Sequence, residues 1–325
     1  MFSFFKAITA MVSMKEGNCT VVSEFILLGF GKGQEPQLIP FLLFLGIYVT
    51  ILLGNIIIVF VIMTNRQLHT PMYFLLTHLS SLDFCYSSVI APKALVSFLS
   101  TSKGISYKGC AAQLFFFAVF VSTEAFILAA MAYDRFTAIC NPLHYSAVMS
   151  KQVCIQLVVG SYFCGFLNSM VQTGLTFRLH YCGPNELDHF FCDVPALMNL
   201  SNSDKYVNEL VLFSLSGVII MSTSLAILVS YVYIVVTILQ IHSSKGRQKA
   251  FSTCTSHMVT VSLFYGTVTF MYAQPSSLSS LAQSKVVSVF YTLVIPMLNP
   301  LIYSLRNKDV KEAFRRTMRK KIFGK

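Results

Sequence analysis

The run GCAAQLFFFAVFVSTEAFILAAMAY, residues 109–133, decides the fold of this chain. It contains one acidic side chain, Glu124, and no basic one. A helix that crosses the hydrocarbon core of a bilayer needs roughly 20 mostly apolar residues, and this run is long enough. It ends at an acid and a base side by side, Asp134-Arg135. The stretch therefore predicts a transmembrane helix whose last turn reaches a membrane surface.

The rest of the chain has the same character. Its 325 residues are 55% hydrophobic and 11% charged, with a mean hydropathy of +0.66, whereas a soluble domain carries about 25% charged residues. Seven segments are apolar and long enough to span a membrane: Gln37–Met63, Met72–Pro92, Gly109–Tyr133, Gln152–Phe177, Leu210–Ile241, Ala250–Gln274 and Val286–Leu305. We therefore expect an all-α membrane protein, a seven-transmembrane helix bundle.

The basic residues predict how the bundle is oriented, because cytoplasmic loops are enriched in Lys and Arg. With the N-terminus outside, most of the bases fall on the cytoplasmic side, many of them in the last 20 residues. This gives an extracellular segment (1–36), a bundle (37–305) and a cytoplasmic tail (306–325). The net charge of +11 is thus a topology signal, and we expect no nucleic-acid binding.

The ends of the chain carry three further signals. We expect no cleavable signal peptide, with the first helix as the insertion signal and either Met1 or Met14 as the start. Asn18-Cys19-Thr20 is an N-glycosylation acceptor on the predicted outer side. Bases alternate with apolar residues between positions 307 and 320, which predicts a short amphipathic helix on the anionic inner leaflet.

Polar residues inside the membrane are costly and need a reason. Asp83 and Glu124 lie in the middle of predicted helices, and Asn55 and Asn299 lie at a comparable depth. If they converge, they form either a site for water or a small cation, or a network of hydrogen bonds with protonated carboxyls. The sequence leaves both alternatives open.

Two other features indicate a bundle that can change shape. Pro92, Pro296 and Pro300 interrupt predicted helices, and proline removes a backbone hydrogen bond and bends a helix. Asp134 can hold Arg135 through a local ion pair that is cheap to break near water. Such a pair suits a two-state switch, and the alternative is a plain interfacial anchor.

The longest loop, about 178–209, lies on the predicted outer side, where disulfides persist. It contains Cys182 and Cys192, while Cys110 lies at the outer start of the third helix. A bridge from Cys110 to Cys192 would hold the loop over the bundle, but spacing alone does not fix the pairing. His189 and Asp193 flank Cys192 and form a poor metal cage, so we expect no metal site.

Five motifs resemble the olfactory receptors, within the rhodopsin-like G-protein-coupled receptors. They are Gly54-Asn55, PMYFLLTHLSSLDFCY (71–86), MAYDRFTAICNPLHY (131–145), KAFSTCTSH (249–257) and PMLNPLIYSLRN (296–307). They follow one another in the order of that family and cover the predicted inner ends of the helices. The stretch SLFYGTVTFMYAQPSS resembles the tetrapod-type (class II) branch.

The resemblance implies roles for several residues. It implies a G-protein switch made of Asp134, Arg135, Tyr231, His257, Asn299, Pro300 and Tyr303. It likens the cluster of Asn55, Asp83 and Glu124 to the sodium site of related receptors, and it implies a Cys110–Cys192 disulfide. The family usually has a further loop cysteine where this chain has Asn202, so Cys182 either stays unpaired or pairs with Cys19.

The resemblance also implies a ligand pocket inside the bundle. Its expected residues are Phe117, Ala118, Val121, Ser122, Leu215, Ile219, Tyr265, Thr269, Tyr272 and Thr292. Phe117 stands where amine receptors carry an aspartate, so a protonated amine has no counter-ion there. The resemblance therefore favours a small, mostly neutral volatile ligand, hydrogen-bonded by Ser122 or Thr269.

The function implied is an odorant receptor that activates a stimulatory heterotrimeric G protein and raises cAMP. The expected location is the plasma membrane, in cilia of olfactory sensory neurons, with a trafficking chaperone as a possible further partner. No cofactor is expected. The alternative is a rhodopsin-like receptor for a lipid-like or other apolar ligand. No internal repeat favours a transporter, and no His-Glu-x-x-His or Gly-x-Ser-x-Gly motif favours an enzyme.

Overall fold

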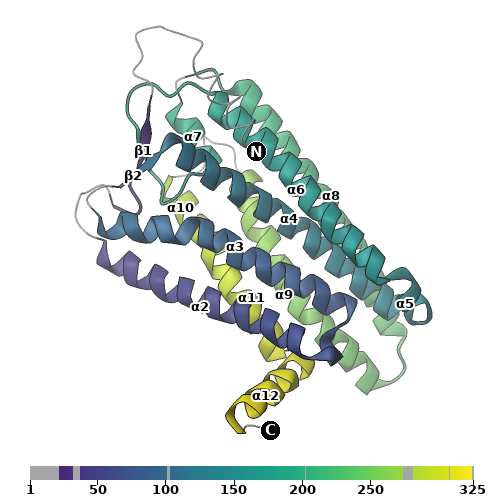
Figure 1. Cartoon of the computed structure of the whole chain (residues 1–325). Helices are drawn as coiled ribbons and strands as arrows, with labels where there is room; N and C mark the ends of the chain where they lie inside the picture. Colours follow the sequence, from purple (N-terminus) through teal and green to yellow (C-terminus); the bar gives the residue numbers. More distant parts are fainter. Residues whose placement is uncertain are drawn as a thin grey trace.

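The computed structural model describes residues 22–31, 37–100, 103–201, 203–273, 281–306 and 308–323. Long helices lie side by side as one bundle (Figure 1). They are α2 (Leu38–Thr64), α3 (Pro71–Leu99), α4 (Tyr107–Cys140), α6 (Lys151–Arg178), α8 (Tyr206–Gln240) and α9 (Ser244–Ala273). A seventh is built from α10 (Leu281–Val289), a π-helical stretch η3 (Phe290–Val294) and α11 (Ile295–Arg306). The predicted helical membrane bundle is confirmed.

Six of these helical segments are long and apolar enough to cross a membrane, judged over the residues described above. The remaining long helix, α9, is less hydrophobic because its apolar part also carries His257 and several hydroxyl residues. Two short inner connections are helical as well. One contains η1 (Arg66–Leu68), and the other contains η2 (Pro142–His144) and α5 (Tyr145–Val148).

Several helices extend beyond their predicted bounds, three of them by six residues or more at one end. α3 continues through Pro92 to Leu99, α4 runs past Tyr133 to Cys140, and α9 begins at Ser244 instead of residue 250. An apolar run marks only the part of a helix that lies in the membrane, whereas the backbone stays helical until a real stop signal. The predicted bounds were wrong for that reason.

The helix α4 forms the centre of the bundle. It packs against α3, α6, α8 and α9, and 72% of its most apolar 18-residue window is buried, against 28% for α2 and for α8. A helix that is hydrophobic all round suits a buried position. Gly165 of α6 allows a close approach, because a Cβ there would lie 2.8 Å from the Val119 carbonyl oxygen of α4.

A small sheet covers the end of the bundle that the sequence predicts to be extracellular, which is called the outer end below, and the opposite end is called the inner end. Its middle strand, β1 (Glu24–Leu27), pairs antiparallel with β2 (Gly104–Ser106) and parallel with β3 (Glu186–Leu187). The sheet joins the segment before α2 to two outer loops, and the longer loop also forms α7 (Val194–Leu200). The sequence did not predict this sheet, because strands of two to four residues leave no alternation to recognise.

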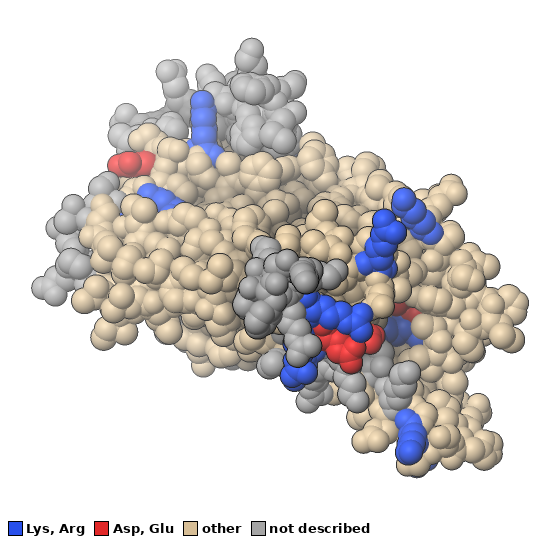
Figure 2. Space-filling model, turned by 60° about the horizontal axis from the view of Figure 1, so that its bottom comes forward, with Lys and Arg blue, Asp and Glu red and all other residues tan. Residues whose placement is uncertain are grey.

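The charged side chains gather toward the two ends of the molecule, and the surface between them carries almost none in the view of Figure 2. At the inner end, helix α12 (Lys308–Phe323) follows α11. It buries Val310 and Ala313, and Arg316 Nη1 donates to Gln67 Oε1 at 2.9 Å. Residues 308–323 are therefore helical, whereas their role as an amphipathic helix on a lipid surface stays a prediction.

Candidate functional site

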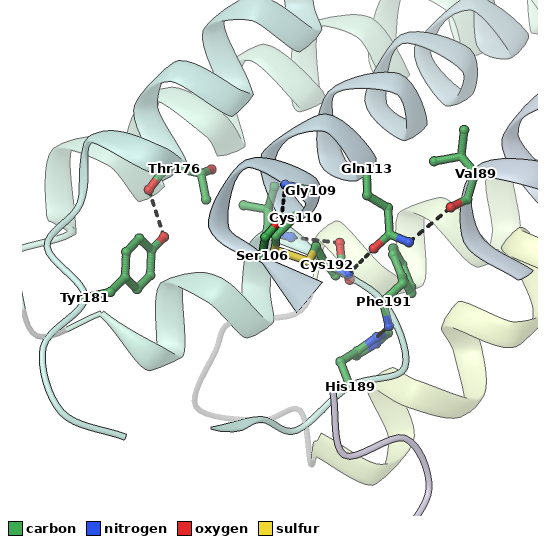
Figure 3. The surroundings of a disulfide bond; sticks show 12 residues. Val89, Ser106, Gly109, Cys110, Gln113, Thr176, Tyr181, His189, Phe191 and Cys192 are labelled. Atoms are coloured by element: carbon green, nitrogen blue, oxygen red, sulfur yellow. Dashed lines mark hydrogen bonds between the residues drawn. A yellow bond between two sulfur atoms is a disulfide. The ribbon is translucent and has the colours of Figure 1, made fainter. Parts of the chain in front are cut away.

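A disulfide fixes the outer loop above the bundle (Figure 3). Cys110 of α4 and Cys192 of the loop are bonded, with their Cα atoms 5.6 Å apart and a sequence separation of 82. The Cys192 N–H also donates to Gln113 Oε1 at 2.9 Å, and Gln113 Nε2 donates to the Val89 carbonyl at 3.1 Å. This confirms the Cys110–Cys192 pairing and shows that hydrogen bonds to two helices support it.

The second loop cysteine is bonded too. Cys182 is in a disulfide, and its partner is not among the described residues. The alternative that Cys182 stays unpaired is therefore wrong. Two other predictions, the glycosylation site at Asn18 and the choice between Met1 and Met14, also lie outside the described residues.

A cavity lies below this loop, among α4, α6, α8 and α9. It encloses about 40 Å³, enough for a few small atoms, since one water needs about 10–15 Å³. Larger ligands must displace side chains. The cavity is lined by Leu114, Phe117, Ala118, Val121, Ser122, Ala125, Asn168, Gln172, Asp193, Val194, Ser216, Ile219, Ile220, Phe264 and Val268.

Five of the predicted ligand residues line this cavity: Phe117, Ala118, Val121, Ser122 and Ile219. The structure thus brings together side chains from α4 and α8 that are distant in sequence. Their contact with a ligand stays a prediction.

The other predicted ligand residues lie elsewhere. Tyr265 is buried and its hydroxyl donates to the Ala125 carbonyl at 3.2 Å, while Thr292 donates to the Ser288 carbonyl at 2.6 Å. Leu215 is half-buried and Thr269 is exposed, and the side chain of Tyr272 lies outside the described residues. None of the four described side chains lines the cavity.

Sequence reasoning missed a chain of polar side chains along one wall of the cavity. Asn168 Nδ2 donates to Ser122 Oγ at 2.8 Å, and Gln172 Nε2 lies 3.3 Å from both Asn168 Oδ1 and Ser216 Oγ. These bonds join α4, α6 and α8. Amide side chains in the middle of an apolar helix were the signal that could have found them, because such residues need partners.

Asp193 was also missed as a lining residue, although it follows Cys192 directly. Its side chain is 1% exposed, and its Oδ1 accepts from the Val194 N–H at 2.9 Å. Tyr291 Oη approaches Oδ2 at 3.5 Å, a long hydrogen bond. Burial raises the pKa of Asp193 to about 7, although both hydrogen bonds lower it. An ionisable group therefore borders a cavity whose other lining residues are apolar or uncharged polar.

The expected polar cluster in the middle of the bundle forms in part. Asn299 Nδ2 donates to Asp83 Oδ2 at 3.0 Å, and Asn55 Nδ2 donates to the Ile51 and Pro296 carbonyls. Glu124 is fully buried and close enough to Asp83 to interact electrostatically.

Several oxygens of this cluster have no partner among the described residues: Asn55 Oδ1, Asp83 Oδ1, Asn299 Oδ1 and both carboxyl oxygens of Glu124. Unpaired buried oxygens suit a small hard cation, water or protons on the carboxyls. The two alternatives for this cluster therefore stay open.

At the inner end of α4 the expected ion pair is absent from the described contacts. The Asp134 carboxylate accepts a hydrogen bond from Tyr145 Oη at 2.8 Å, and no contact within 4.0 Å joins it to Arg135. The reason is geometric, because neighbouring residues on a helix point in different directions. Arg135 is 3% exposed, and its Nε has no partner in the described part of the chain.

The inner halves of three helices meet at His257 of α9. Its Nε2 lies 3.1 Å from the Leu128 carbonyl of α4, and its Nδ1 lies 2.7 Å from Tyr231 Oη of α8. A carbonyl only accepts, so Nε2 carries the proton and the Tyr231 hydroxyl donates to Nδ1. Arg135 lies near enough to act electrostatically on His257 and Tyr231.

The remaining predicted switch residues belong to α11. Tyr303 is buried near Arg135 and Thr260, and its hydroxyl makes no hydrogen bond within 3.5 Å among the described residues. Pro300 packs closely on α2, where a Cβ at Gly54 would lie 3.1 Å from the Pro300 Cβ. The structure therefore gathers Arg135, Tyr231, His257 and Tyr303 at one end, and their role in a switch stays a prediction.

Comparisons with known proteins agree with this architecture. The family model described as "Olfactory receptor" matches residues 44–321. The human olfactory receptor OR9H1 is 58% identical over 303 residues, which cover 93% of this chain and 98% of that receptor.

Other relatives match almost as well. The mouse olfactory receptor 9S13 is 58% identical over 93% of this chain and 91% of that receptor, and the human olfactory receptor 9G4 is 55% identical over 94% and 93%. These relatives are receptors rather than enzymes, and together with the apolar helices they indicate a multi-pass plasma-membrane protein. The chain belongs to the olfactory receptor family.

Proposed function

We propose that this receptor binds small, mostly neutral volatile molecules in the cavity below the outer loop and activates a stimulatory heterotrimeric G protein, which raises cAMP. One observation carries the proposal: the helices that line the cavity are the helices that meet at His257. Phe117, Ile219 and Phe264 border the cavity from α4, α8 and α9, and Leu128, Tyr231 and His257 join the same three helices further in.

A ligand acts on such an arrangement by population shift. His257 holds α9 against α4 and α8 in the present structure. A ligand that binds better when α9 is displaced moves the equilibrium by its difference in affinity between the two states. Displacement of α9 would free Arg135, which is buried beside His257, to meet the G protein.

A groove at the inner ends of α8 and α9 supports the docking of a G-protein segment there. It encloses about 530 Å³, and it is lined by Val235, Ile238, Leu239, Ser244, Arg247, Gln248 and Phe251. An apolar floor with one basic side chain suits the apolar face of an amphipathic helix.

The cellular setting proposed follows from the family. The receptor is expected in cilia of olfactory sensory neurons and to need a trafficking chaperone to reach the surface. The second candidate function, a receptor for a lipid-like ligand, draws on the same apolar cavity, and a ligand screen separates the two.

The test is cAMP output in cells that express the full chain with the olfactory G protein and a trafficking chaperone. The cells are screened against neutral volatiles and against lipid-like compounds. Arg135→Ala is compared with Arg66→Ala, because Arg66 is an exposed arginine on the same predicted side.

We expect a dose-dependent response to a volatile that Arg66→Ala keeps and Arg135→Ala loses at equal surface expression. Intact output from Arg135→Ala would contradict the switch. A response to lipid-like compounds alone would favour the second candidate.

A further inference from the structure

The cavity has one ionisable side chain in its wall. Among the described residues that line it, Asp193 is the only acid, and none is a lysine, arginine or histidine. The position of Asp193 is well fixed, because Cys192 before it is bonded to Cys110 and to Gln113 (Figure 3). The wall therefore presents a preorganised acceptor to whatever enters the cavity.

This carboxyl group has unused hydrogen-bonding capacity. An ionised carboxylate offers about four acceptor positions, and in this structure it accepts a bond of 2.9 Å from Val194 and a long one of 3.5 Å from Tyr291. The side chain is 1% exposed, so water reaches it poorly. A buried carboxylate that is incompletely hydrogen-bonded is costly, and burial raises the pKa of Asp193 to about 7. A donor that arrives with a ligand would relieve that cost.

The remainder of the wall defines the rest of the ligand. The polar groups of Asn168, Gln172 and Ser122 are largely hydrogen-bonded to one another. Ser122 also lies twelve residues, or about 18 Å, along α4 from Cys110, the residue that holds the loop with Asp193. Apolar side chains such as Leu114, Phe117 and Val194 complete the wall. The complementary molecule has an apolar body and one hydrogen-bond donor at its end.

We propose that Asp193 is the polar anchor of the ligand, accepting a hydrogen bond from the terminal hydroxyl or ammonium group of a small apolar molecule. This inference rests on the proposed function, since it names the ligand class of the same cavity. It also changes the expectation drawn from Phe117: α4 carries no counter-ion for an amine, but the outer loop supplies one.

The test compares ligands that share a skeleton and differ in their donor. The full chain is purified in detergent, and its melting temperature is followed against concentration of four probes: 1-hexanol, hexylamine, hexanal and methyl pentyl ether. We expect 1-hexanol and hexylamine to stabilise the protein at lower concentrations than hexanal or the ether. A hydrogen bond to a charged group predicts a preference of about tenfold or more.

Two variants identify the acceptor. Asp193→Asn keeps the shape and an oxygen for the Val194 N–H, because asparagine caps a helix as well as aspartate does. It should lose about tenfold in affinity for hexylamine while hexanal is unaffected. Asp188→Asn is the matched control, an acid of the same loop that pairs with Lys285 and does not line the cavity, and it should keep the preference.

Each other outcome overturns the proposal. Equal stabilisation of the wild-type protein by all four probes, or by none, would show that no donor is recognised. A uniform loss for every probe in Asp193→Asn would show a structural role instead. If the proposed function failed instead, the probes with a hydrogen-bond donor would still raise the melting temperature preferentially, but no ligand would raise cAMP output.

Discussion

The two ends of the bundle are built in opposite ways. At the outer end a disulfide, a three-stranded sheet and the Gln113 bonds hold the long loop on α4. At the inner end no covalent bond joins the described helices, and buried polar atoms of Arg135 and Tyr303 have no partner among the residues described. Buried polar groups without partners are costly, so the inner end is where a second arrangement of the helices can compete.

The contrast indicates that the outer end, the middle and the inner end of α4 have different roles. α4 carries Cys110 at its fixed outer end, the cavity residues in its middle, and Arg135 at its loosely held inner end. A rigid outer end gives a ligand a defined site, and a loosely held inner end allows a small preference for one arrangement to become a movement.

Removing the disulfide should have the largest effect on this contrast. The bond closes a loop with a sequence separation of 82, for which the chain-entropy model gives about 4.5 kcal/mol. We expect Cys110→Ser to lower the melting temperature strongly and to reduce surface expression. Cys164→Ser, which removes an exposed free cysteine, is the control, and equal stability of the two variants would contradict a fixed outer end.

The second-largest effect on stability is expected at the close contact of α6 with α4, which lies between the two ends of the bundle. Gly165→Ala would place a Cβ 2.8 Å from the Val119 carbonyl oxygen and close to Thr123 Oγ1, so α4 and α6 must separate, at a cost of about 1–3 kcal/mol. Gly160→Ala on the same helix meets no atom within 4 Å and should be neutral or slightly stabilising. Thermal unfolding of the two variants measures the difference, and matching curves would disprove tight packing there.

The smallest change in stability, but an informative one, is expected at the inner end. His257→Ala removes two hydrogen bonds that tie α9 to α4 and α8, each worth about 1 kcal/mol. We expect a several-fold rise in cAMP output without ligand, because the variant lacks the hydrogen bonds that hold α9 in the position seen in this structure. Reduced or unchanged basal output at equal surface expression would show that His257 does not hold the resting state.

The sequence predicted the helices well because hydrophobicity in a membrane protein reports directly on the bilayer. It predicted their ends poorly, since residues such as Asp134 to Cys140 continue α4 outside the apolar run. In the seventh helix prolines suggested a bend at Pro296 and Pro300, whereas the structure has its π-helical stretch earlier, at Phe290–Val294. A change of hydrogen-bond register in a helix has no simple sequence signal.

The site was predictable only where a single helix determined it. Phe117, Ala118, Val121 and Ser122 follow helical spacing on α4 and line the cavity together. Asp193 reaches the same cavity because its neighbour Cys192 is bonded to Cys110, 82 positions before Cys192, and no local pattern encodes that bond. Thr269 faces outward because the rotation of α9 about its axis depends on packing against its neighbours.

The most direct test of a fixed outer end and a movable inner end is a pair of distances measured by spin labels. The inner pair is Ser146 with Gln248, and the outer pair is Leu99 with Tyr206, all exposed positions. The three free cysteines that are not buried, Cys85, Cys140 and Cys164, are first replaced by serine, while the buried Cys154 and Cys254 are kept.

With the most active volatile from the cAMP screen, the account predicts that the inner distance lengthens by several ångströms while the outer distance stays the same. A ligand that changed the outer distance and left the inner one unaltered would contradict it.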